Sequence, residues 1–260
     1  MVEIMVFGLK KGGRYGVSTN GMSPLLVTYH HPKSPVSEAF RTLRTSLHFT
    51  SPGSQLRLLA VTSAGPEEGK STVAANLAIA LAQAGNRVLI VDSDLRKPVQ
   101  HKLFQVPASP GVTNVLVDGL PVEKATVDLS IEGLSLLPSG PIPPNPSELL
   151  GSGPMENLLK ECTTRFAYVL LDTPPVLSVA DTMVVCSRLD GVILVVRAGV
   201  TRTDMVREAK EMIEQARGKI VGVVLNGVRY SSDEYRYYYY YSHHGETRDR
   251  NVQRGVGTIV

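Results

Sequence analysis

The stretch SAGPEEGKST, residues 63–72, has the residue types and spacing to hold phosphate groups. Read as [AG]xxxxGK[ST], it starts at Ala64 and ends with Gly69, Lys70 and Ser71. In such a loop, backbone N–H groups and the N-terminus of the next helix face the phosphates. The lysine reaches the β- and γ-phosphates, and the serine ligates Mg²⁺. A chance glycine-rich turn is the alternative, but the strand pattern before it and the helix pattern after it favour a phosphate loop.

Three aspartates that follow apolar runs are candidate ligands for the metal. VLIVDSD ends at Asp92 and Asp94, and YVLLDTPP contains Asp172. A buried strand that ends in aspartate puts the carboxylate at the carboxyl edge of a parallel sheet, where such folds bind ligands. Mg²⁺ prefers a few carboxylates, waters and phosphate oxygens. Each aspartate alone would more often be a turn former or a helix cap, but three at the edge of a phosphate loop favour function.

The segments that position these residues alternate between strand and helix patterns. The strand-like runs are almost continuously apolar, which predicts a mostly parallel sheet buried on both faces. The expected fold is therefore α/β, a P-loop NTPase-like sheet flanked by helices on both faces. Strands are predicted within 56–63, 87–94, 133–140, 166–175, 190–199 and 219–228, and helices within 34–49, 70–85, 154–165 and 203–216.

Three parts are expected along the chain. Residues 1–32 lack a clear period and predict a flexible lead-in, 33–229 form the P-loop domain, and 230–260 form a mobile tail rich in tyrosine. The first helix of the domain should start with Ser34 as its cap and Pro35 in its first turn. Its apolar stripe at i, i+3 and i+7 consists of Phe40, Leu43 and Leu47.

The bulk composition excludes several classes of protein. The chain has 260 residues and a net charge of only +3, which does not demand nucleic acid. Its two cysteines, Cys162 and Cys186, have no ligand spacing, so neither a zinc site nor a disulfide scaffold is expected. No apolar run approaches the length of a membrane span and the start is a poor signal peptide, so a cytoplasmic location is expected.

Four stretches together resemble the bacterial tyrosine kinases of capsule and exopolysaccharide systems. They are VTSAGPEEGKSTVAANLA, VLIVDSDLRKP, LLPSGPIPPNPSELL and YVLLDTPP, and the resemblance runs from about Ser34 to Val228. It implies an ATP- and Mg²⁺-dependent protein-tyrosine kinase. It also implies that Asp94 ligates the metal and that Asp172 acts on Mg²⁺ through water. Asp92 would accept the tyrosine hydroxyl proton and help to organise the metal site.

The expected contacts to the nucleotide extend beyond the phosphate loop. Arg96 could help the phosphates or order the loop after Asp94. Asn226 could contact adenine, but a turn-forming role is equally open. Glu67 replaces a glycine that the family favours, so a positive φ there would strain it and its carboxylate would weaken binding. The full expected set is Gly65, Glu68, Gly69, Lys70, Ser71, Thr72, Arg96 and Asn226.

Glu38, Arg41 and Arg44 match an ExxRxxR motif, which in the family lies at the subunit interface of a ring-shaped oligomer. A solvated charged helix face is the alternative. Related kinases without membrane spans depend on a separate transmembrane modulator. The resemblance therefore implies this partner, recruitment to the inner face of the membrane, a cognate tyrosine phosphatase, and a role in polysaccharide synthesis and export.

Six of the ten tyrosines lie within seven residues near the C-terminus. As an isolated pattern this segment could be a sticky tail that stacks on a partner. Beside a tyrosine kinase domain, it is expected to be the substrate that a neighbouring subunit phosphorylates in trans. The predicted phosphoacceptors are Tyr235, Tyr237, Tyr238, Tyr239, Tyr240 and Tyr241.

Two other functions share much of this pattern. A partitioning or cell-division-positioning ATPase would have the same aspartates, but it usually carries a second lysine in the loop, where this chain has Gly65. A nucleotide-binding regulator with little catalysis is the other alternative, and Glu67 gives it some weight. Phosphotyrosine formation, ATP hydrolysis without it, or neither would distinguish the three functions.

Overall fold

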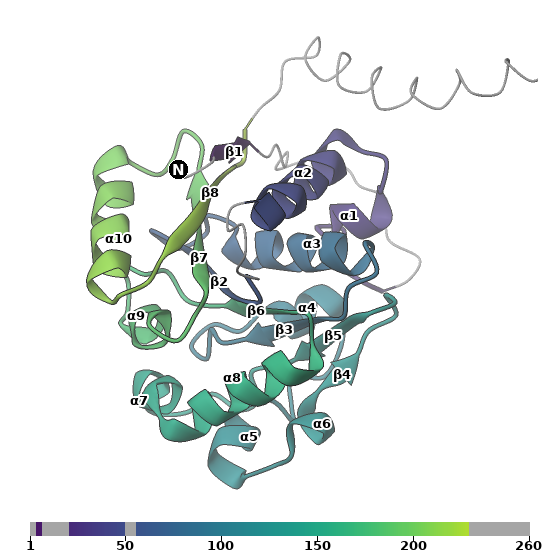
Figure 1. The fold of residues 1–260 in the computed structure, drawn as a ribbon, viewed down its shortest axis with the longest axis vertical. Helices are drawn as coiled ribbons and strands as arrows, with labels where there is room; N and C mark the ends of the chain where they lie inside the picture. Colours follow the sequence, from purple (N-terminus) through teal and green to yellow (C-terminus); the bar gives the residue numbers. More distant parts are fainter. Residues whose placement is uncertain (1–3, 7–20, 50–55, 229–260) are drawn as a thin grey trace, which may run out of the picture.

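The computed structural model describes residues 4–6, 21–49 and 56–228 (Figure 1). Within them, eight strands form one sheet in the order β1-β8-β7-β2-β6-β3-β5-β4. Neighbouring strands are parallel except β4 and β5, which are antiparallel. The strands are β1 (Ile4–Val6), β2 (Leu58–Ser63), β3 (Val88–Asp92), β4 (Val127–Asp128), β5 (Leu134–Leu137), β6 (Tyr168–Asp172), β7 (Gly191–Arg197) and β8 (Ile220–Asn226).

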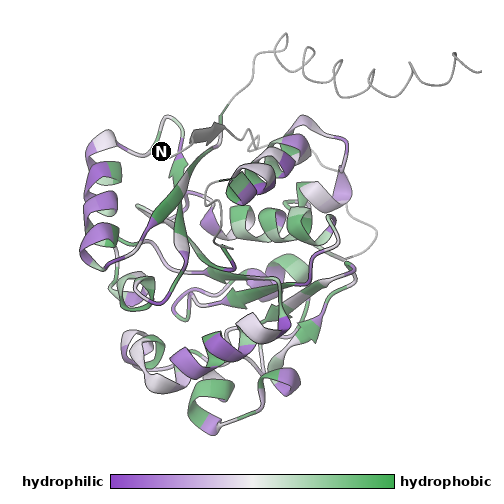
Figure 2. Cartoon of the chain, viewed as in Figure 1, coloured by the Kyte–Doolittle hydropathy of each residue, from purple (hydrophilic) through white to green (hydrophobic). Residues whose placement is uncertain are grey.

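Helices cover both faces of the sheet, as predicted (Figure 1). One face packs against α1 (Val27–His30), α2 (Pro35–Phe49), α3 (Lys70–Ala82) and α4 (Gln100–Phe104). The other face packs against α5 (Val112–Asp118), α6 (Val122–Ala125), α7 (Pro146–Gly151), α8 (Gly153–Arg165), α9 (Asp181–Cys186) and α10 (Thr203–Gln215). Figure 2 shows apolar central strands and hydrophilic outer surfaces on α8 and α10.

The helix that follows the phosphate loop is buried almost all round. From Val73 to Ala82 every residue of α3 is buried, because the helix lies between the sheet on one side and α1 and α2 on the other. Its sequence, KSTVAANLAIALA, is apolar after the first turn except for Asn76, which is typical of a central helix. The phosphate loop is therefore anchored at both ends in the core, by β2 and by α3.

The prediction of a flexible lead-in over residues 1–32 is corrected for the part that the structure describes, because this part packs against the domain. Leu26 and Val27 belong to the core against α3, and β1 pairs in parallel with β8. The backbone N–H of Thr28 donates to Asn76 Oδ1 on α3 at 2.9 Å. The folded unit thus begins before residue 33, since these apolar side chains cover the outer surface of α3. The predicted tail, 230–260, lies outside the described residues.

The first predicted helix has the expected start and the expected buried stripe. The backbone N–H of Ser37 donates to Ser34 Oγ at 3.2 Å, and Pro35 occupies the first turn of α2. Phe40, Leu43 and Leu47 are buried. In contrast, β4 and the short helices α1, α4, α5, α6, α7 and α9 were not predicted, because four to seven residues are too few to show a helical period.

Two further expectations bear on the environment of the protein. In the part of the chain that the structure describes, no helix has both the length and the apolar character to cross a bilayer. Cys162 and Cys186 are buried free thiols. Burial raises the pKa of Cys162 to about 12 and that of Cys186 to about 11, so both remain protonated near neutral pH.

Candidate functional site

The candidate phosphate loop lies at the carboxyl ends of the parallel strands, between Ser63 at the end of β2 and Lys70 at the start of α3. Gly69 has a φ of 94°, in the left-handed region. A Cβ at this position would lie 2.1 Å from Asn226 Nδ2, so both the backbone conformation and the space require glycine. The end of β8 therefore presses directly on the loop.

The side chain of Lys70 is the centre of the site. Its Nζ donates to Asp94 Oδ2 at 2.8 Å, to Asp172 Oδ1 at 3.1 Å and to Ser71 Oγ at 3.1 Å. These groups come from α3, the loop after β3 and the end of β6, and β6 lies between β2 and β3 in the sheet. Burial disfavours the charged ammonium, but the carboxylates of Asp172 and Asp94 outweigh burial and raise the pKa of Lys70. The lysine is thus a buried cation held by two carboxylates.

A second carboxylate lies directly beside Asp172. Asp92 and Asp172 are paired across β3 and β6, and both are fully buried. Asp92 Oδ2 accepts from the backbone N–H of Gln100 at 3.0 Å, while Oδ1 has no partner among the described residues. Burial, followed by the negative charge of Asp172, raises the pKa of Asp92 to about 8. A carboxyl with a pKa near neutrality suits proton transfer.

The oxygen atoms around Lys70 suit a Mg²⁺ ion that also binds waters and phosphates. They do not suit a metal whose ligands all come from the protein. Asp94, Asp172, Asp92 and the Ser71 hydroxyl offer oxygen ligands only, as a hard cation requires. No three His, Cys, Asp or Glu side chains in the described part of the chain are arranged to hold an ion by themselves. Mg²⁺ keeps waters and substrate phosphates as ligands, and the unpartnered Oδ1 of Asp92 is a buried oxygen that such a shell would satisfy.

Two predicted nucleotide contacts, Arg96 and Asn226, have their side chains bonded elsewhere. Arg96 pairs with Asp181 at 2.9 Å, which favours the role of ordering the loop after Asp94. Asn226 Nδ2 donates to the carbonyl of Glu68 at 2.8 Å, and its Oδ1 accepts from the Gly227 N–H at 2.9 Å. Both ends of the Asn226 amide are therefore engaged in the turn and the loop.

Glu68 turns into the loop and away from solvent. Its carboxylate accepts from the N–H groups of Ala64 at 3.2 Å and Gly65 at 3.1 Å, and from the Thr201 hydroxyl at 2.7 Å. Burial raises the pKa of Glu68 despite these hydrogen bonds. The same carboxylate lies 3.3 Å from where a Cβ on Gly65 would stand, so it fills the space beside that glycine. Thr72 lies in the first turn of α3 and is half-buried.

Gln100 joins the site although the sequence motifs gave no signal for it. It is the first residue of α4 and is fully buried. Its Nε2 donates to Asp172 Oδ2 at 2.8 Å and to the carbonyl of Ser71 at 3.0 Å. Asp181, which accepts hydrogen bonds from Arg96, was also missed because it lies 85 residues further along the chain. The only hint of Gln100 was a polar residue two positions after the Asp-x-Asp-Leu-Arg-Lys-Pro run.

Glu67 has a φ of 60°, so the position where the family favours glycine does require the left-handed region. Its side chain is exposed, and its carbonyl accepts from Arg197 at 2.8 Å. We expect Glu67→Gly to lower the Kd for Mg²⁺–ATP about two- to fivefold, because an exposed charge near the phosphates is worth about 0.5–1 kcal/mol. Calorimetric titration with ATP measures this change.

Glu67→Gln is the matched control, because it removes the charge and keeps the strained side chain. It should reproduce the gain in affinity, whereas only Glu67→Gly should relieve the backbone strain and raise the free energy of unfolding. An unchanged or higher Kd in Glu67→Gly would contradict this prediction.

The three residues of the ExxRxxR motif lie on α2. Arg41 forms hydrogen bonds with Glu38 and with the carbonyl of Pro32, and Arg44 donates to the carbonyl of Ala80 on α3 at 2.9 Å. These contacts are within one chain, so they explain the local order of the side chains. Their role between subunits stays a prediction.

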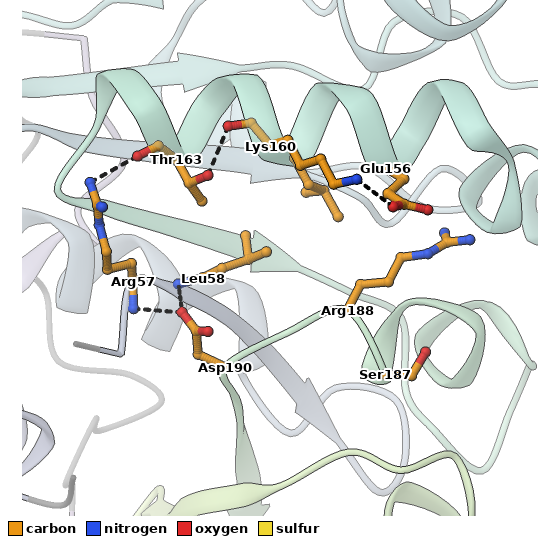
Figure 3. Close-up of a pocket in the computed structure, with 9 residues that line it drawn as sticks. Arg57, Leu58, Glu156, Lys160, Thr163, Ser187, Arg188 and Asp190 are labelled. Carbon is orange, nitrogen blue, oxygen red and sulfur yellow. Dashed lines mark hydrogen bonds and ion pairs between the residues drawn. The ribbon is translucent and has the colours of Figure 1, made fainter. Parts of the chain in front are cut away.

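A separate cavity of about 530 Å³ lies at the amino ends of β2 and β7, at the opposite edge of the sheet (Figure 3). Most of the charged side chains that line it form hydrogen bonds with the backbone of neighbouring elements. Arg57 donates to the carbonyls of Thr163 and Phe166, and Arg188 donates to carbonyls at the end of α7. Asp190 Oδ2 accepts from two backbone N–H groups at the start of β2. The cavity has no loop resembling the one at Lys70.

The fold and the loop together define a P-loop NTPase. A family model described as "ParA: NUBPL iron-transfer P-loop NTPase" matches residues 56–255. The chain is 42% identical to the tyrosine-protein kinase YwqD of Bacillus subtilis over 214 residues, which cover 82% of this chain and 90% of that protein. The chain belongs to the bacterial tyrosine-protein kinases, as the four sequence stretches predicted.

Two solved structures agree with this relationship. The kinase domain of the Escherichia coli tyrosine kinase ETK superposes with a TM-score of 0.81 at 32% identity, covering 89% of this chain and 93% of that one. The chimerical protein CapA2B2 gives a TM-score of 0.80 at 37% identity, covering 88% of this chain and 96% of that one. At the level of family, these findings favour the kinase over a partitioning ATPase.

Proposed function

We propose that the protein is an ATP- and Mg²⁺-dependent tyrosine kinase that phosphorylates its own C-terminal tyrosine cluster in trans. The observation that carries the proposal is the convergence on Lys70 of Asp94, Asp172 and Ser71, with Asp92 directly beside Asp172. Phosphoryl transfer needs a cation for the transferred group, oxygen ligands for a metal and a carboxylate that orients the nucleophile. This group of side chains supplies all three.

In the proposed reaction, the phenol oxygen of a tyrosine attacks the γ-phosphorus of ATP. The bond from that phosphorus to the bridging oxygen breaks, ADP leaves, and the phenol proton passes to Asp92. Lys70, once it leaves Asp94 and Asp172, would neutralise the charge that spreads over the phosphate oxygens. Mg²⁺, held by Ser71, Asp94 and Asp172, would supply further charge neutralisation. The raised pKa of Asp92 supports its role as proton acceptor.

Binding of ATP would change the partners of Lys70. Lys70 is engaged by two carboxylates that the proposal assigns to the metal. On binding of ATP and Mg²⁺, Lys70 would exchange Asp94 and Asp172 for phosphate oxygens, and the two carboxylates would be free to hold the metal. The site therefore keeps its charges paired in both states, which limits the cost of burying them.

The proposed setting is a polysaccharide export system at the inner face of the membrane. A transmembrane modulator would activate the kinase, a tyrosine phosphatase would reverse its action, and subunits would form a ring through Glu38, Arg41 and Arg44. Membership of the tyrosine kinase family supports this proposal, as does the position of the three residues on the surface helix α2.

A weakly catalytic nucleotide-binding regulator is the second candidate. The exposed carboxylate of Glu67 favours it, because a negative charge beside the phosphates would lower affinity for the nucleotide. Incubation with labelled ATP and Mg²⁺, with and without the cytoplasmic segment of a candidate activator, separates the two. Phosphotyrosine supports the kinase, and bound nucleotide without hydrolysis or label supports the regulator.

Deleting residues 235–241 is expected to remove most autophosphorylation and to leave the Kd for ATP unchanged. The deletion removes all six predicted acceptors, and it does not touch the loop or the carboxylates. Each added phosphate brings about −1.5 to −2 charges, so phosphorylation of several tyrosines should also loosen an oligomer by repulsion. Label incorporation and size-exclusion chromatography before and after ATP test both points. A phosphorylated protein that keeps its oligomer would contradict the second.

A further inference from the structure

Gln100 lies where three parts of the site meet. It begins α4, eight residues after Asp92, and none of its surface is exposed. Asp92 ends β3, Asp172 ends β6, and Ser71 is the second residue of α3. Gln100 contacts a group from each of these three elements, so its position is fixed by the site as much as by its own short helix.

The contacts define the orientation of the Gln100 amide. Nε2 lies 2.8 Å from Asp172 Oδ2 and 3.0 Å from the carbonyl oxygen of Ser71. Both partners accept hydrogen bonds only, so the nitrogen must face them and each of its hydrogens has one acceptor. The backbone N–H of the same residue donates to Asp92 Oδ2 at 3.0 Å. The Oε1 atom is buried and has no partner among the described residues.

We propose that Gln100 is a positioning residue of the phosphoryl-transfer site. Its amide bridges Asp172 and the first turn of α3, and so holds these two parts of the site together. This inference rests on the proposed function, because it assigns Gln100 to the same reaction. Asp172 then has separate donors for its two oxygens, Lys70 on Oδ1 and Gln100 on Oδ2.

The chemistry of an amide suits this position. When Lys70 exchanges Asp172 for a phosphate, Gln100 remains as a donor that holds the carboxylate in place. A neutral donor adds no cation that would compete with Mg²⁺, and no anion that would repel Asp92 and Asp172. Partners that orient the ligands of a metal commonly change affinity or rate about 10–100-fold when they are removed.

Gln100→Met is the direct test, because methionine has similar length and volume but cannot donate. The experiment measures kcat and KM for ATP, the Mg²⁺ concentration that gives half the maximal rate, and calorimetric binding of ADP with and without Mg²⁺. We expect kcat to fall about 10–100-fold, with a smaller change in KM. The gain in ADP affinity that Mg²⁺ provides should shrink.

Gln100→Asn separates positioning from space filling. Asparagine keeps the amide, but it is one methylene too short to reach both acceptors, so kcat should fall in this variant too. If Gln100 only filled space, methionine would be tolerated and asparagine alone would be harmful. Should Gln100→Met fail to fold, Gln100→Asn decides the point by where its loss falls. A positioning role lowers kcat and the gain in ADP affinity that Mg²⁺ provides, and leaves ADP binding without Mg²⁺ unchanged. A packing defect lowers the free energy of unfolding and weakens ADP binding equally with and without Mg²⁺, which would overturn the inference.

Gln105→Met is the matched control, because Gln105 is exposed at the end of the same helix. Among the described residues, the hydrogen bond of its side chain is local, to the carbonyl of Lys102. It should behave as the unsubstituted protein. An active protein whose Gln100→Met variant keeps kcat, the Mg²⁺ dependence and Mg²⁺-assisted ADP binding would overturn this inference alone. Absence of phosphotyrosine from the unsubstituted protein would overturn the proposed function, and this inference with it.

Discussion

Lys70→Met is expected to abolish phosphotyrosine formation and also to destabilise the nucleotide-free protein. Loss of one preorganised donor to a transferring group costs about 10²–10³ in rate, and Lys70 is the charged donor of the loop. Without it, Asp94 and Asp172 lose their shared cation in the core of the site. Removing one partner of a buried ion pair costs about 3–5 kcal/mol, because the remaining charge stays uncompensated.

Label transfer from ATP and denaturant unfolding of the nucleotide-free protein measure the two effects. Lys102→Met is the matched control: Lys102 is exposed on α4, so its substitution should change neither activity nor stability. Added Mg²⁺ should restore part of the stability of Lys70→Met, since it gives Asp94 and Asp172 a cation again, but it should not restore transfer. A Lys70→Met protein that is as stable as the unsubstituted one would contradict the account of Lys70 as the counter-charge of the site.

The convergence of Lys70 with the three aspartates could be predicted because it depends on strands that are recognisable from the sequence. Each aspartate follows a run of apolar residues, and such runs form buried parallel strands. The carboxyl ends of parallel strands share one edge of the sheet, so Asp92, Asp94 and Asp172 had to meet near the loop that follows β2. The order of the strands was not needed for this conclusion.

The partners of the site could not be predicted in the same way. Arg96 bonds to Asp181, and Glu68 accepts a hydrogen bond from Thr201, which lies 133 residues further along the chain. Both pairs form through the packing of helices and loops, which no local sequence pattern describes. Gln100 begins a helix of five residues, which is too short to show periodicity. The packing of residues 22–28 on α3 was missed for a related reason: a few apolar side chains in a polar segment matter only once the helix that they cover is known.

Three contacts from neighbouring parts of the sheet hold the phosphate loop. The phosphate loop has little side-chain mass of its own, and its shape is held from outside by Asn226 on Glu68, by Arg197 on Glu67 and by Thr201 on the Glu68 carboxylate. All three come from the ends of β7 and β8 or the turn that follows β7. The motif thus marks where phosphate would bind, and the neighbouring strand ends give the loop its geometry.

Asp92→Asn is expected to abolish transfer and yet to stabilise the nucleotide-free protein, with a gain that grows with pH. Burial and the neighbouring charge of Asp172 raise the pKa of Asp92 to about 8, well above its value in an unfolded chain, about 3.9. Below pH 4 the carboxyl is protonated in both states and costs nothing. Between pH 4 and 8 the unfolded chain releases the proton and the folded protein retains it, so the native state loses stability as pH rises.

Asparagine removes this penalty because it is neutral at every pH, and its amide oxygen can still accept from the Gln100 N–H. The gain in unfolding free energy should therefore grow by up to about 1.4 kcal/mol per pH unit between pH 4 and 8 and level off above. Each kcal/mol raises Tm by about 2–4 °C. Thermal unfolding of both proteins across this range measures the gain, with Asp118→Asn, an exposed aspartate on α5, as the control. A gain that is independent of pH would show that Asp92 is ionised throughout, and a gain that shrinks as pH rises would reverse the sign of its electrostatic environment.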